Sequence, residues 1–303
     1  MMFESFITQI ITYTTVYTLV TLGIIIAGRT GIFIVAGEGI MLASASAGFI
    51  MSYVSGNWVI GFVSGALMGA VFGLILISLH EIFKVNQFIL GICLVILGLG
   101  FSDFLYKLVF GIVLSAPMAP NVPKVIIPVL SSIPLLRAFF KHDLIVYFMY
   151  IVTFLTYIFL YKTKLGLETR AIGEHPKAAD VVGVNVTLRR YLSTIIGSAL
   201  IGLGGAYLPI VITKTYIPEI AAGRGFIALG IAIFASWKPE RAILGSFIFA
   251  AIEVISYQLQ LSQIGIPYQF FLMLPFVFVL LVMVIFKKQI EFPESIGQPY
   301  SRE

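Results

Sequence analysis

The sequence predicts an all-α integral membrane protein with about nine transmembrane helices. Hydrophobic residues make up 59% of the 303 residues and charged residues only 11%, and the mean hydropathy is +1.05. A soluble fold of this length could not bury so much apolar surface. A helix needs about 20 apolar residues to cross the hydrocarbon layer, and a chain without the alternating pattern of a barrel has no other means of spanning it.

Nine apolar stretches are long enough to be read as spans. No basic residue precedes the first and no small-residue cleavage site follows it, so we read it as a helix and not as a signal peptide. The second and the seventh contain glycines beside a charge, which favours broken or re-entrant helices and leaves an even number of crossings as the alternative. The stretches are Ile7–Ala27, Ile32–Tyr53, Trp58–Leu79, Phe88–Ile112, Leu144–Tyr161, Tyr191–Ile212, Glu219–Trp237, Ala242–Leu259 and Tyr268–Phe286.

The segment Lys162–Arg190 is the longest charged interruption of the apolar pattern and holds 6 of the 19 Lys and Arg residues. Within it, Pro176 suits the first turn of a helix, because that turn leaves its N–H groups unbonded. Gly183 suits a left-handed cap at the other end. The sequence therefore predicts a short helix, Pro176–Val182, which is partly apolar and typical of a docking element. The alternative is a loop helix that lies on the membrane surface.

The distribution of basic residues predicts the orientation. With nine crossings and the loop 162–190 inside, the inside segments carry 13 Lys and Arg residues and the outside segments carry 4. This places the N-terminus outside and the C-terminus in the cytoplasm. Residues 1–288 then form the transmembrane domain and 289–303 a cytoplasmic tail. The net charge of +5 follows from this topology and does not point to a nucleic-acid partner.

The external segment Val113–Asp143 is the long connection on the outer side. It contains five prolines, which break regular helices, although its part Val125–Leu136 is apolar enough to lie on the membrane surface. We therefore expect this segment to be the surface on which an external partner lands. The prolines are Pro117, Pro120, Pro123, Pro128 and Pro134.

Two short motifs suggest an inverted repeat. Gly37-Glu38-Gly39 lies in a stretch that runs outward and Gly223-Arg224-Gly225 in one that runs inward. A motif of this kind in two opposite orientations is what an inverted repeat would leave. Glycine costs about 1 kcal/mol against alanine within a helix, so both helices are weakened there. Broken helices at mid-depth are tolerated where protein or a wet cavity surrounds them.

Charged residues within the apolar stretches are candidates for the translocation path. Glu38 lies near the middle of the bilayer, and its alternative role is a structural charge bonded to helix termini. A second group falls at i, i+3, i+4 and i+7 of one helix, a polar stripe that either lines an aqueous path or bonds to a neighbouring helix. Thr8, Thr12 and Thr15 form a weaker stripe that we assign to helix packing. The candidate path residues are Glu38, Arg224, Glu253, Ser256, Tyr257 and Gln260.

Gly65, Gly69 and Gly73 repeat at four-residue spacing within one stretch. Small residues at this spacing let two helix backbones approach closely. We expect the partner helix to be in the same chain, and a dimer interface is the alternative.

Motifs of catalysis are missing from the sequence. There is no G-x-x-x-x-G-K-[ST] phosphate loop, no H-E-x-x-H and no G-x-S-x-G. His80, His142 and His175 lack metal-ligand spacing, and Cys93, the single cysteine, excludes an intrachain disulfide. We expect no catalytic residue, no metal site and no bound cofactor, so an intramembrane enzyme is disfavoured.

Three blocks resemble the permease subunits of ABC importers of the branched-chain amino acid, ribose-type sugar and nucleoside class. They are Thr169–Val186, Gly223–Phe234 and Ala36–Leu42, and the resemblance extends from about Phe6 to Phe286. It is strongest toward the nucleoside and simple-sugar branch, because the amino-acid branch more often has a histidine-glycine pair near Gly37. A branched-chain amino acid permease is the nearest alternative. An ion-coupled secondary transporter, in which Glu38 or Glu253 would titrate, is a rival from another class.

The resemblance implies a transport protein of the cell membrane that does not hydrolyse ATP itself. Its implied partners are a cytoplasmic ATP-binding subunit, a second permease subunit that is identical or paralogous, and an extracytoplasmic solute-binding protein. The loop helix would be the coupling helix that enters a cleft of the ATP-binding subunit. The residues assigned to this coupling are Glu174, His175, Pro176, Lys177, Ala178, Ala179, Asp180 and Val181.

Overall fold

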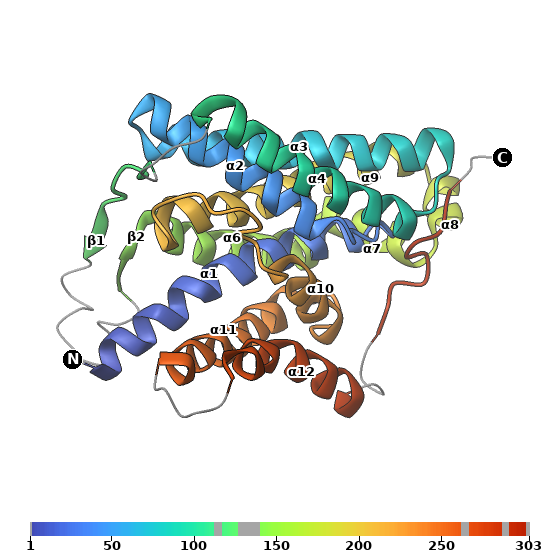
Figure 1. Ribbon diagram of the computed structural model, residues 1–303. Helices are drawn as coiled ribbons and strands as arrows, with labels where there is room; N and C mark the ends of the chain where they lie inside the picture. Colours follow the sequence, from blue (N-terminus) through green and yellow to red (C-terminus); the bar gives the residue numbers. More distant parts are fainter. Residues whose placement is uncertain (1, 112–116, 127–139, 262–266, 287–290, 301–303) are drawn as a thin grey trace.

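A computed structural model describes residues 2–111, 117–126, 140–261, 267–286 and 291–300. The chain is mostly helical, and its N-terminus and the short helix α8 lie at opposite ends of a helix bundle (Figure 1). The elements are α1 (Met2–Gly28), α2 (Gly37–Ser55), α3 (Trp58–Phe83), α4 (Gln87–Phe110), β1 (Lys124–Ile126), β2 (Lys141–Asp143), α6 (Leu144–Lys162), α7 (Lys164–Glu174), α8 (Pro176–Val181), α9 (Val186–Tyr207), the π-helical turn η1 (Leu208–Ile212), α10 (Arg224–Phe234), α11 (Pro239–Leu261) and α12 (Tyr268–Phe286).

Side-chain caps set where several helices begin. Asn57, Asn86, Asp143 and Asn185 each accept a hydrogen bond from a backbone amide in the first turn of α3, α4, α6 and α9. Each bond satisfies an amide that has no partner within its helix. Most of these residues interrupt apolar sequence, so the boundaries of the helices follow from single polar positions.

Seven helices of the described chain are long and apolar enough to cross a membrane. They are α1, α3, α4, α6, α9 with η1, α11 and α12. The other two predicted stretches, Ile32–Tyr53 and Glu219–Trp237, are indeed broken: α2 begins only at Gly37 and α10 covers only Arg224–Phe234. Helix length and hydropathy thus support seven crossings among these residues and not the nine we predicted.

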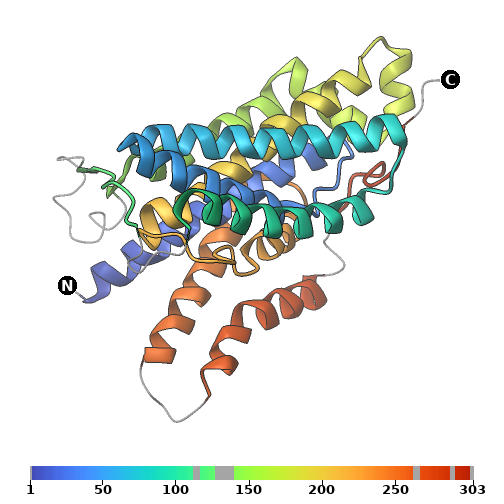
Figure 2. The same cartoon turned by 45° about the horizontal axis from the view of Figure 1, so that its top comes forward.

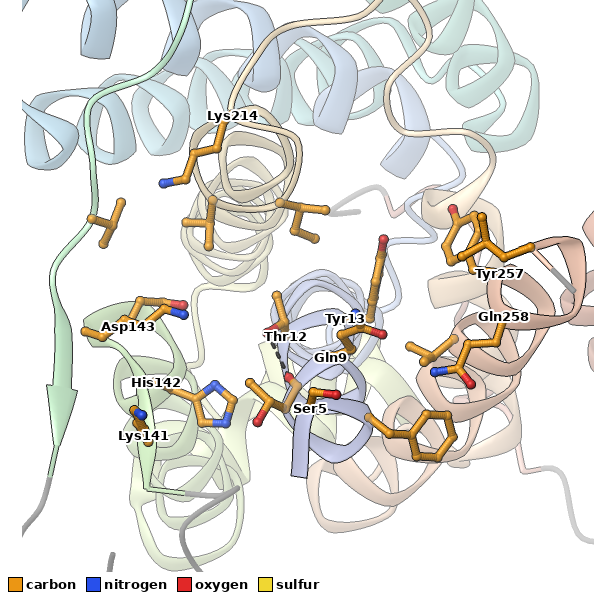
Figure 3. Close-up of a pocket in the computed structure, with 18 residues that line it drawn as sticks. Ser5, Gln9, Thr12, Tyr13, Lys141, His142, Asp143, Lys214, Tyr257 and Gln258 are labelled. Carbon is orange, nitrogen blue, oxygen red and sulfur yellow. Dashed lines mark hydrogen bonds between the residues drawn. The ribbon is translucent and has the colours of Figure 1, made fainter. Parts of the chain in front are cut away.

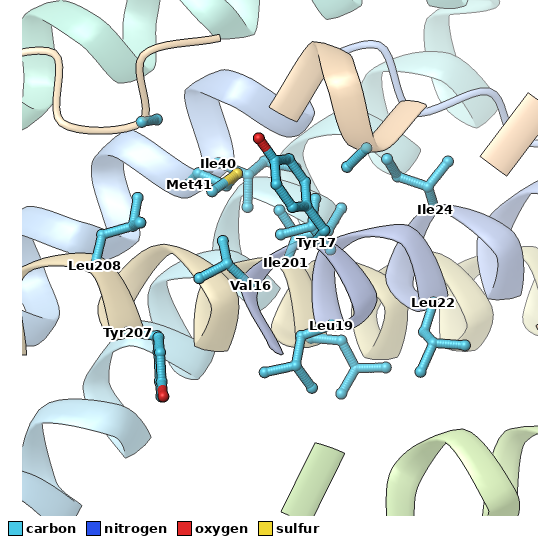
Figure 4. Packing of buried hydrophobic residues seen from close by; sticks show 14 of the residues in the cluster. Val16, Tyr17, Leu19, Leu22, Ile24, Ile40, Met41, Ile201, Tyr207 and Leu208 are labelled. Atoms are coloured by element: carbon cyan, nitrogen blue, oxygen red, sulfur yellow. The ribbon is translucent and has the colours of Figure 1, made fainter. Parts of the chain in front are cut away.

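The helices form an inner group and an outer group. In α1, 89% of the most apolar window is buried, against 28% in α4 and 17% in α12. Figure 4 shows the core where α1, α2 and α9 meet, with Val16 and Tyr17 of α1 near Met41 and Ile201. The outer helices carry the exposed leucine, valine and phenylalanine side chains. Most residues of α1 and α2 are covered by protein, so a charge such as that of Glu38 in α2 can lie there although lipid would exclude it.

The glycine repeat of α3 packs on α9 of the same chain. A Cβ atom added to Gly69 would lie 2.2 Å from the carbonyl oxygen of Ser198, and one on Gly65 would lie 2.6 Å from Cβ of Ala206. Gly73 faces Ser198 in the same way. The expectation of close helix packing within the chain is therefore confirmed, since any side chain there would separate the two backbones.

At the end of the bundle opposite α8, strands β1 and β2 pair in an antiparallel ribbon, with Lys124 opposite Asp143. The sequence analysis predicted no strand. The ribbon joins the two ends of the predicted external segment, whose residues 127–139 lie outside the described chain. The apolar part Val125–Leu136, which we expect to lie on the membrane surface, falls almost entirely outside the described residues.

The helices α11 and α12 form a hairpin that stands at an angle to the rest of the bundle (Figure 2). Beyond it, residues 291–300 return to the end that carries α7 and α8 (Figure 1). The segment we predicted as a separate tail thus packs against the coupling loop, and Ser295 donates its amide to the carbonyl oxygen of Gly173 at 2.9 Å.

Candidate functional site

The predicted loop helix is present as α8. Pro176 occupies its first turn, and the helix ends at Val181, one residue before the predicted end. Gly183 has a φ of +88°. Its amide donates to the carbonyl oxygen of Asp180 at 2.9 Å, and the amide of Val184 donates to that of Ala179 at 3.1 Å. These two bonds form a Schellman cap, which confirms the role predicted for Gly183.

The exposed side of α8 is apolar with a charge at its edge. Val181 and Val182 are 87% and 78% exposed, and Lys177 and Ala178 are exposed beside them. We call these four residues the coupling face. Glu174 and His175 precede it, also exposed, and Nδ1 of His175 lies 3.4 Å from a carboxylate oxygen of Glu294.

Ala179 does not belong to the coupling face. It is only 3% exposed and packs with Ile172, Val186 and Tyr300 of its own chain. The helical period explains the difference within α8, because residue 179 lies on the opposite side of the helix from residues 177 and 181, while Val182 follows the end of the helix. Ala179 therefore holds α8 against its own chain and lies outside the coupling face, and the partner contact assigned to it stays a prediction.

Glu38 bonds to the start of α10. One carboxylate oxygen accepts the amide of Gly223 and the other accepts the amide of Gly225, each at 2.7 Å. Both amides belong to the first turn of α10, where a negative charge is also favoured by the helix dipole. The structural alternative for Glu38, a charge bonded to helix termini, is the arrangement that the structure has.

Arg224 and Glu253 form a buried ion pair between α10 and α11. Nη2 and Nε of Arg224 lie 2.6 and 3.0 Å from Oε1 of Glu253. The hydroxyl of Tyr17 in α1 donates to Oε2 of Glu253 at 2.7 Å, and the hydroxyl of Tyr257 donates to Oε1 at 3.1 Å. Every member is at least partly buried. The network therefore ties three helices together at the level where α10 begins.

The other two residues of the polar stripe, Ser256 and Gln260, do not bond to this network. The hydroxyl of Ser256 donates to the carbonyl oxygen of Phe271 in α12, and the side-chain amide of Gln260 lies 3.5 Å from that hydroxyl. The structure thus brings Glu38, Arg224, Glu253 and Tyr257 together around α10. Ser256 connects α11 to α12, and Gln260 bonds to Ser256 within α11.

A large cavity of the described chain lies at the end opposite α8. Its volume is about 1100 Å³, and it is enclosed by α1, η1, α11 and the β ribbon. Figure 3 shows the side chains of Gln9, Thr12 and Tyr13 of α1 on one side and those of Tyr257 and Gln258 of α11 on the other. Of the six predicted path residues, Tyr257 is the one that this cavity includes.

Charges at the cavity come from its rim. Lys124 and Lys141 of the ribbon and Lys214 after η1 line it together with Asp143. The pKa of Lys214 is lowered from its usual value, chiefly because the ammonium group is partly buried. The carboxylate of Asp143 opposes this shift, and the charge of Lys124 adds to it. Asp143 accepts the hydroxyl of Tyr207 at 2.7 Å and also caps α6, so its carboxylate is held in place.

Most lining residues of the cavity were not predicted. Thr8 and Thr12 line it, although we had assigned their spacing to helix packing, and Thr15 of the same stripe is fully buried. A signal was present, because Gln9 and Tyr13 follow the two threonines on neighbouring positions of the same helix. The partners from the ribbon and from Lys214 are far away in the sequence and carried no such signal.

Comparison with known proteins now adds to this geometry. Residues 6–285 match the family described as the branched-chain amino acid transport system permease component. A guanosine ABC transporter permease protein of Bacillus subtilis is 32% identical over 239 residues, which cover 77% of this chain and 74% of that protein. A nucleoside ABC transporter permease protein of Lactococcus lactis is 31% identical over 249 residues, which cover 78% and 75% of the two chains.

A third relative is named for a different solute. A putative glucose ABC transporter permease protein of Haloferax volcanii is 34% identical over 201 residues, which cover 65% of this chain and 58% of that protein. No solved structure matches the chain significantly. The family match spans almost the whole apolar sequence, and these relatives are all named as permease proteins of ABC transporters. The chain therefore belongs to the family of branched-chain amino acid transport system permease components.

Proposed function

We propose that this chain forms the translocation path of an ATP-driven importer for a nucleoside or a simple sugar. The observation that carries the solute class is the similarity to permeases named for guanosine, for nucleosides and for glucose. The branched-chain amino acid alternative has a shorter match, to a probable permease of Methanocaldococcus jannaschii that covers 34% of this chain.

The cavity of about 1100 Å³ supports this solute class. Gln9 and Gln258 offer amide groups that can both donate to and accept from the hydroxyl groups of a sugar ring. The hydroxyl oxygens of Thr8 and Thr12, which donate to backbone carbonyl oxygens, can still accept. The rings of Tyr13 and Tyr257 have centroids 5.8 Å apart. An apolar pocket with a few convergent polar groups is typical of a site for a small uncharged solute.

We place the ATP-binding subunit at the coupling face. Lys177, Ala178, Val181 and Val182 form a small apolar surface at the end of the bundle away from the cavity. Rim charges in water are worth about 0–1 kcal/mol each, so the two valines should supply most of the contact. A partner that moves α8 would act on the membrane helices through Ala179 and the elements beneath it.

We further infer that α2 and α10, each together with the non-helical residues before it, also cross the membrane. Added to the seven long helices, they would give nine crossings. The positive-inside count then places loop 162–190, α8 and the C-terminus in the cytoplasm. The cavity, the β ribbon and the N-terminus would face outward, where an extracytoplasmic solute-binding protein would deliver the solute. A second permease subunit would stand beside this one in the bilayer.

The ion-coupled alternative would need a carboxylate free to bind and release a cation or proton. Both oxygens of Glu38 accept backbone amides, and Glu253 is paired with Arg224. These bonds favour a structural role for both carboxylates and thereby support the ATP-driven mechanism.

Uptake by the reconstituted importer tests this proposal. The permease, its ATP-binding subunit and its binding protein would be placed in proteoliposomes with labelled guanosine, ribose, glucose or leucine. We expect uptake of a nucleoside or sugar that needs ATP and survives dissipation of the proton and sodium gradients. Uptake of leucine alone would support the amino-acid alternative. Uptake driven by an ion gradient without the ATP-binding subunit would contradict the proposal.

A further inference from the structure

Residues 291–300 form a strap across the end of the bundle that carries α8. The amide of Ser295 donates to the carbonyl oxygen of Gly173 at 2.9 Å, and its hydroxyl lies 2.7 Å from the same oxygen. The amide of Gly297 donates to the carbonyl oxygen of Gly31 at 2.9 Å. The strap is thus bonded both to the end of α7 and to the loop between α1 and α2.

Tyr300, near the end of the strap, lies against the inner side of α8. It is 6% exposed and packs with Ala179, Ile172 and Val186 in a small cluster separate from the main core. Within α8, which is described throughout, Ala179 is the buried side chain. The contact that holds α8 to the protein therefore includes the ring of Tyr300.

The same residue contacts two membrane helices. The guanidinium carbon of Arg190, in α9, lies 5.8 Å from the centroid of the Tyr300 ring. The ammonium group of Lys84, at the end of α3, donates to the carbonyl oxygen of Tyr300. Arg190 is completely buried and its Nη1 lies 3.0 Å from a carboxylate oxygen of Glu81 in α3. Tyr300 thus lies between α8 and a fixed ion pair of the bundle.

A hollow beside Tyr300 shows why this contact matters. A cavity of about 520 Å³ lies between the end of α3 and the turn from α8 to α9, and Lys84, Asp180, Asn185 and Tyr300 are among its lining residues. On this side α8 and α3 are separated by open space. Besides the chain itself, which runs from α8 into α9, Tyr300 offers a direct route from α8 to α3, because its ring packs on Ala179 and its carbonyl oxygen accepts the ammonium group of Lys84.

We propose that Tyr300 is a positioning residue for transport, through which the strap transmits the movement of α8 to α3 and α9. This inference rests on the proposed function, because it assumes that a partner moves α8. Removal of the ring would leave the coupling face exposed and able to bind the partner. Movement of α8 would then no longer reach α3 and α9 through this contact, and ATP hydrolysis would no longer be matched by transport.

The test compares Tyr300→Ala with Tyr300→Phe, which retains the ring, and with Pro299→Ala at an exposed neighbouring position. Reconstituted importers are assayed for ATP-binding subunit retained, ATP hydrolysed and guanosine taken up. For Tyr300→Ala we expect normal retention, continued hydrolysis and a fall of about tenfold in uptake per ATP, within the range for residues that couple distant sites. Tyr300→Phe and Pro299→Ala should keep the wild-type ratio.

A second measurement does not depend on transport. Hydrogen exchange of the peptide that covers residues 172–186 should be faster in Tyr300→Ala than in the wild type and unchanged in Tyr300→Phe. If Tyr300→Ala does not accumulate, Tyr300→Leu, which keeps apolar volume but loses the ring over Arg190, replaces it in both assays.

Three outcomes would overturn the inference: a wild-type ratio of uptake to ATP in Tyr300→Ala, loss of the ATP-binding subunit from it, or unchanged exchange in residues 172–186. Failure of the proposed function gives a different result, since the wild type itself would then show no ATP-dependent uptake while the exchange difference would remain measurable.

Discussion

The carboxylate of Glu38 in α2 accepts a hydrogen bond from the backbone amide of Gly225 in α10, at 2.7 Å. The two residues are 187 positions apart in the chain and belong to the two Gly-charge-Gly motifs. A Cβ atom on Gly225 would lie 2.4 Å from the amide nitrogen of Glu38. The motifs are thus packed directly against each other where two helices begin, so that one motif's charge satisfies the other motif's free amides. Whether this reflects an inverted repeat stays a prediction.

Removing the carboxylate of Glu38 should destabilise the protein. In Glu38→Ala the buried amides of Gly223 and Gly225 lose their acceptor, which costs about 1–3 kcal/mol per unsatisfied group. Glu38→Gln keeps one acceptor oxygen and should lose less. The midpoint of thermal unfolding in detergent measures the effect, with Glu240→Ala at an exposed position as the control. Equal midpoints for Glu38→Ala and the control would contradict the role assigned to Glu38.

Adding a methyl group at Gly225 should separate α2 from α10. The new Cβ would overlap backbone atoms of Glu38, which cannot move aside as a flexible side chain could. We expect Gly225→Ala to lower the yield of folded protein in the membrane. Gly100→Ala is the matched control, because no atom lies within 4 Å of a Cβ at that position. Fluorescence-detected size exclusion of both variants decides between steric overlap and a general glycine effect.

The ion pair of Arg224 and Glu253 should behave as a unit. Glu253→Leu alone leaves a buried guanidinium without its partner, at a cost of about 3–5 kcal/mol. Replacing both residues by leucine removes both charges and should cost less than the sum of the two single changes. A double-mutant cycle on unfolding in detergent measures this coupling. Additive effects would mean that the two charges do not depend on each other, although Tyr17 and Tyr257 would lose bonds in either case.

The coupling face should depend more on Val181 than on Lys177. Val181 is 87% exposed, so Val181→Arg should leave the permease folded while it obstructs an apolar contact and releases the ATP-binding subunit. Lys177→Gln should have a mild effect. Co-purification of the ATP-binding subunit with each variant measures this, and equal recovery from wild type and Val181→Arg would show that α8 is not the docking element. Ala179 is unsuitable for this test because its side chain is internal.

Labelling of single cysteines should locate the two ends of the bundle. In a Cys93→Ser background, Gln258→Cys at the large cavity should react with a membrane-impermeant maleimide added to intact cells. Lys177→Cys on the coupling face should react only after the cells are opened. The reverse pattern would invert the orientation that we infer from the positive-inside count. Protection of Gln258→Cys by the transported nucleoside would further place the solute in the cavity.

The sequence by itself determined the features that depend on local composition. Apolar length marks where helices cross, since an unbonded backbone group in lipid is too costly for any other arrangement. Pro176 and Gly183 predicted α8 almost to the residue, because the ends of a helix depend on the backbone preferences of single residues. The four-residue spacing of Gly65, Gly69 and Gly73 predicted close packing, which depends only on the absence of side chains on one face.

Only the tertiary structure decided which groups meet. Glu38 could have lined a path or bonded to a helix end, and the choice depends on α10, which is distant in the sequence. The burial of Ala179 depends on Tyr300, which covers it from the far end of the chain. The cavity combines α1, α11 and the ribbon, so no single stretch could reveal it. Contacts of this kind are set by how helices pack together, and the pattern within one helix carries no record of its neighbours.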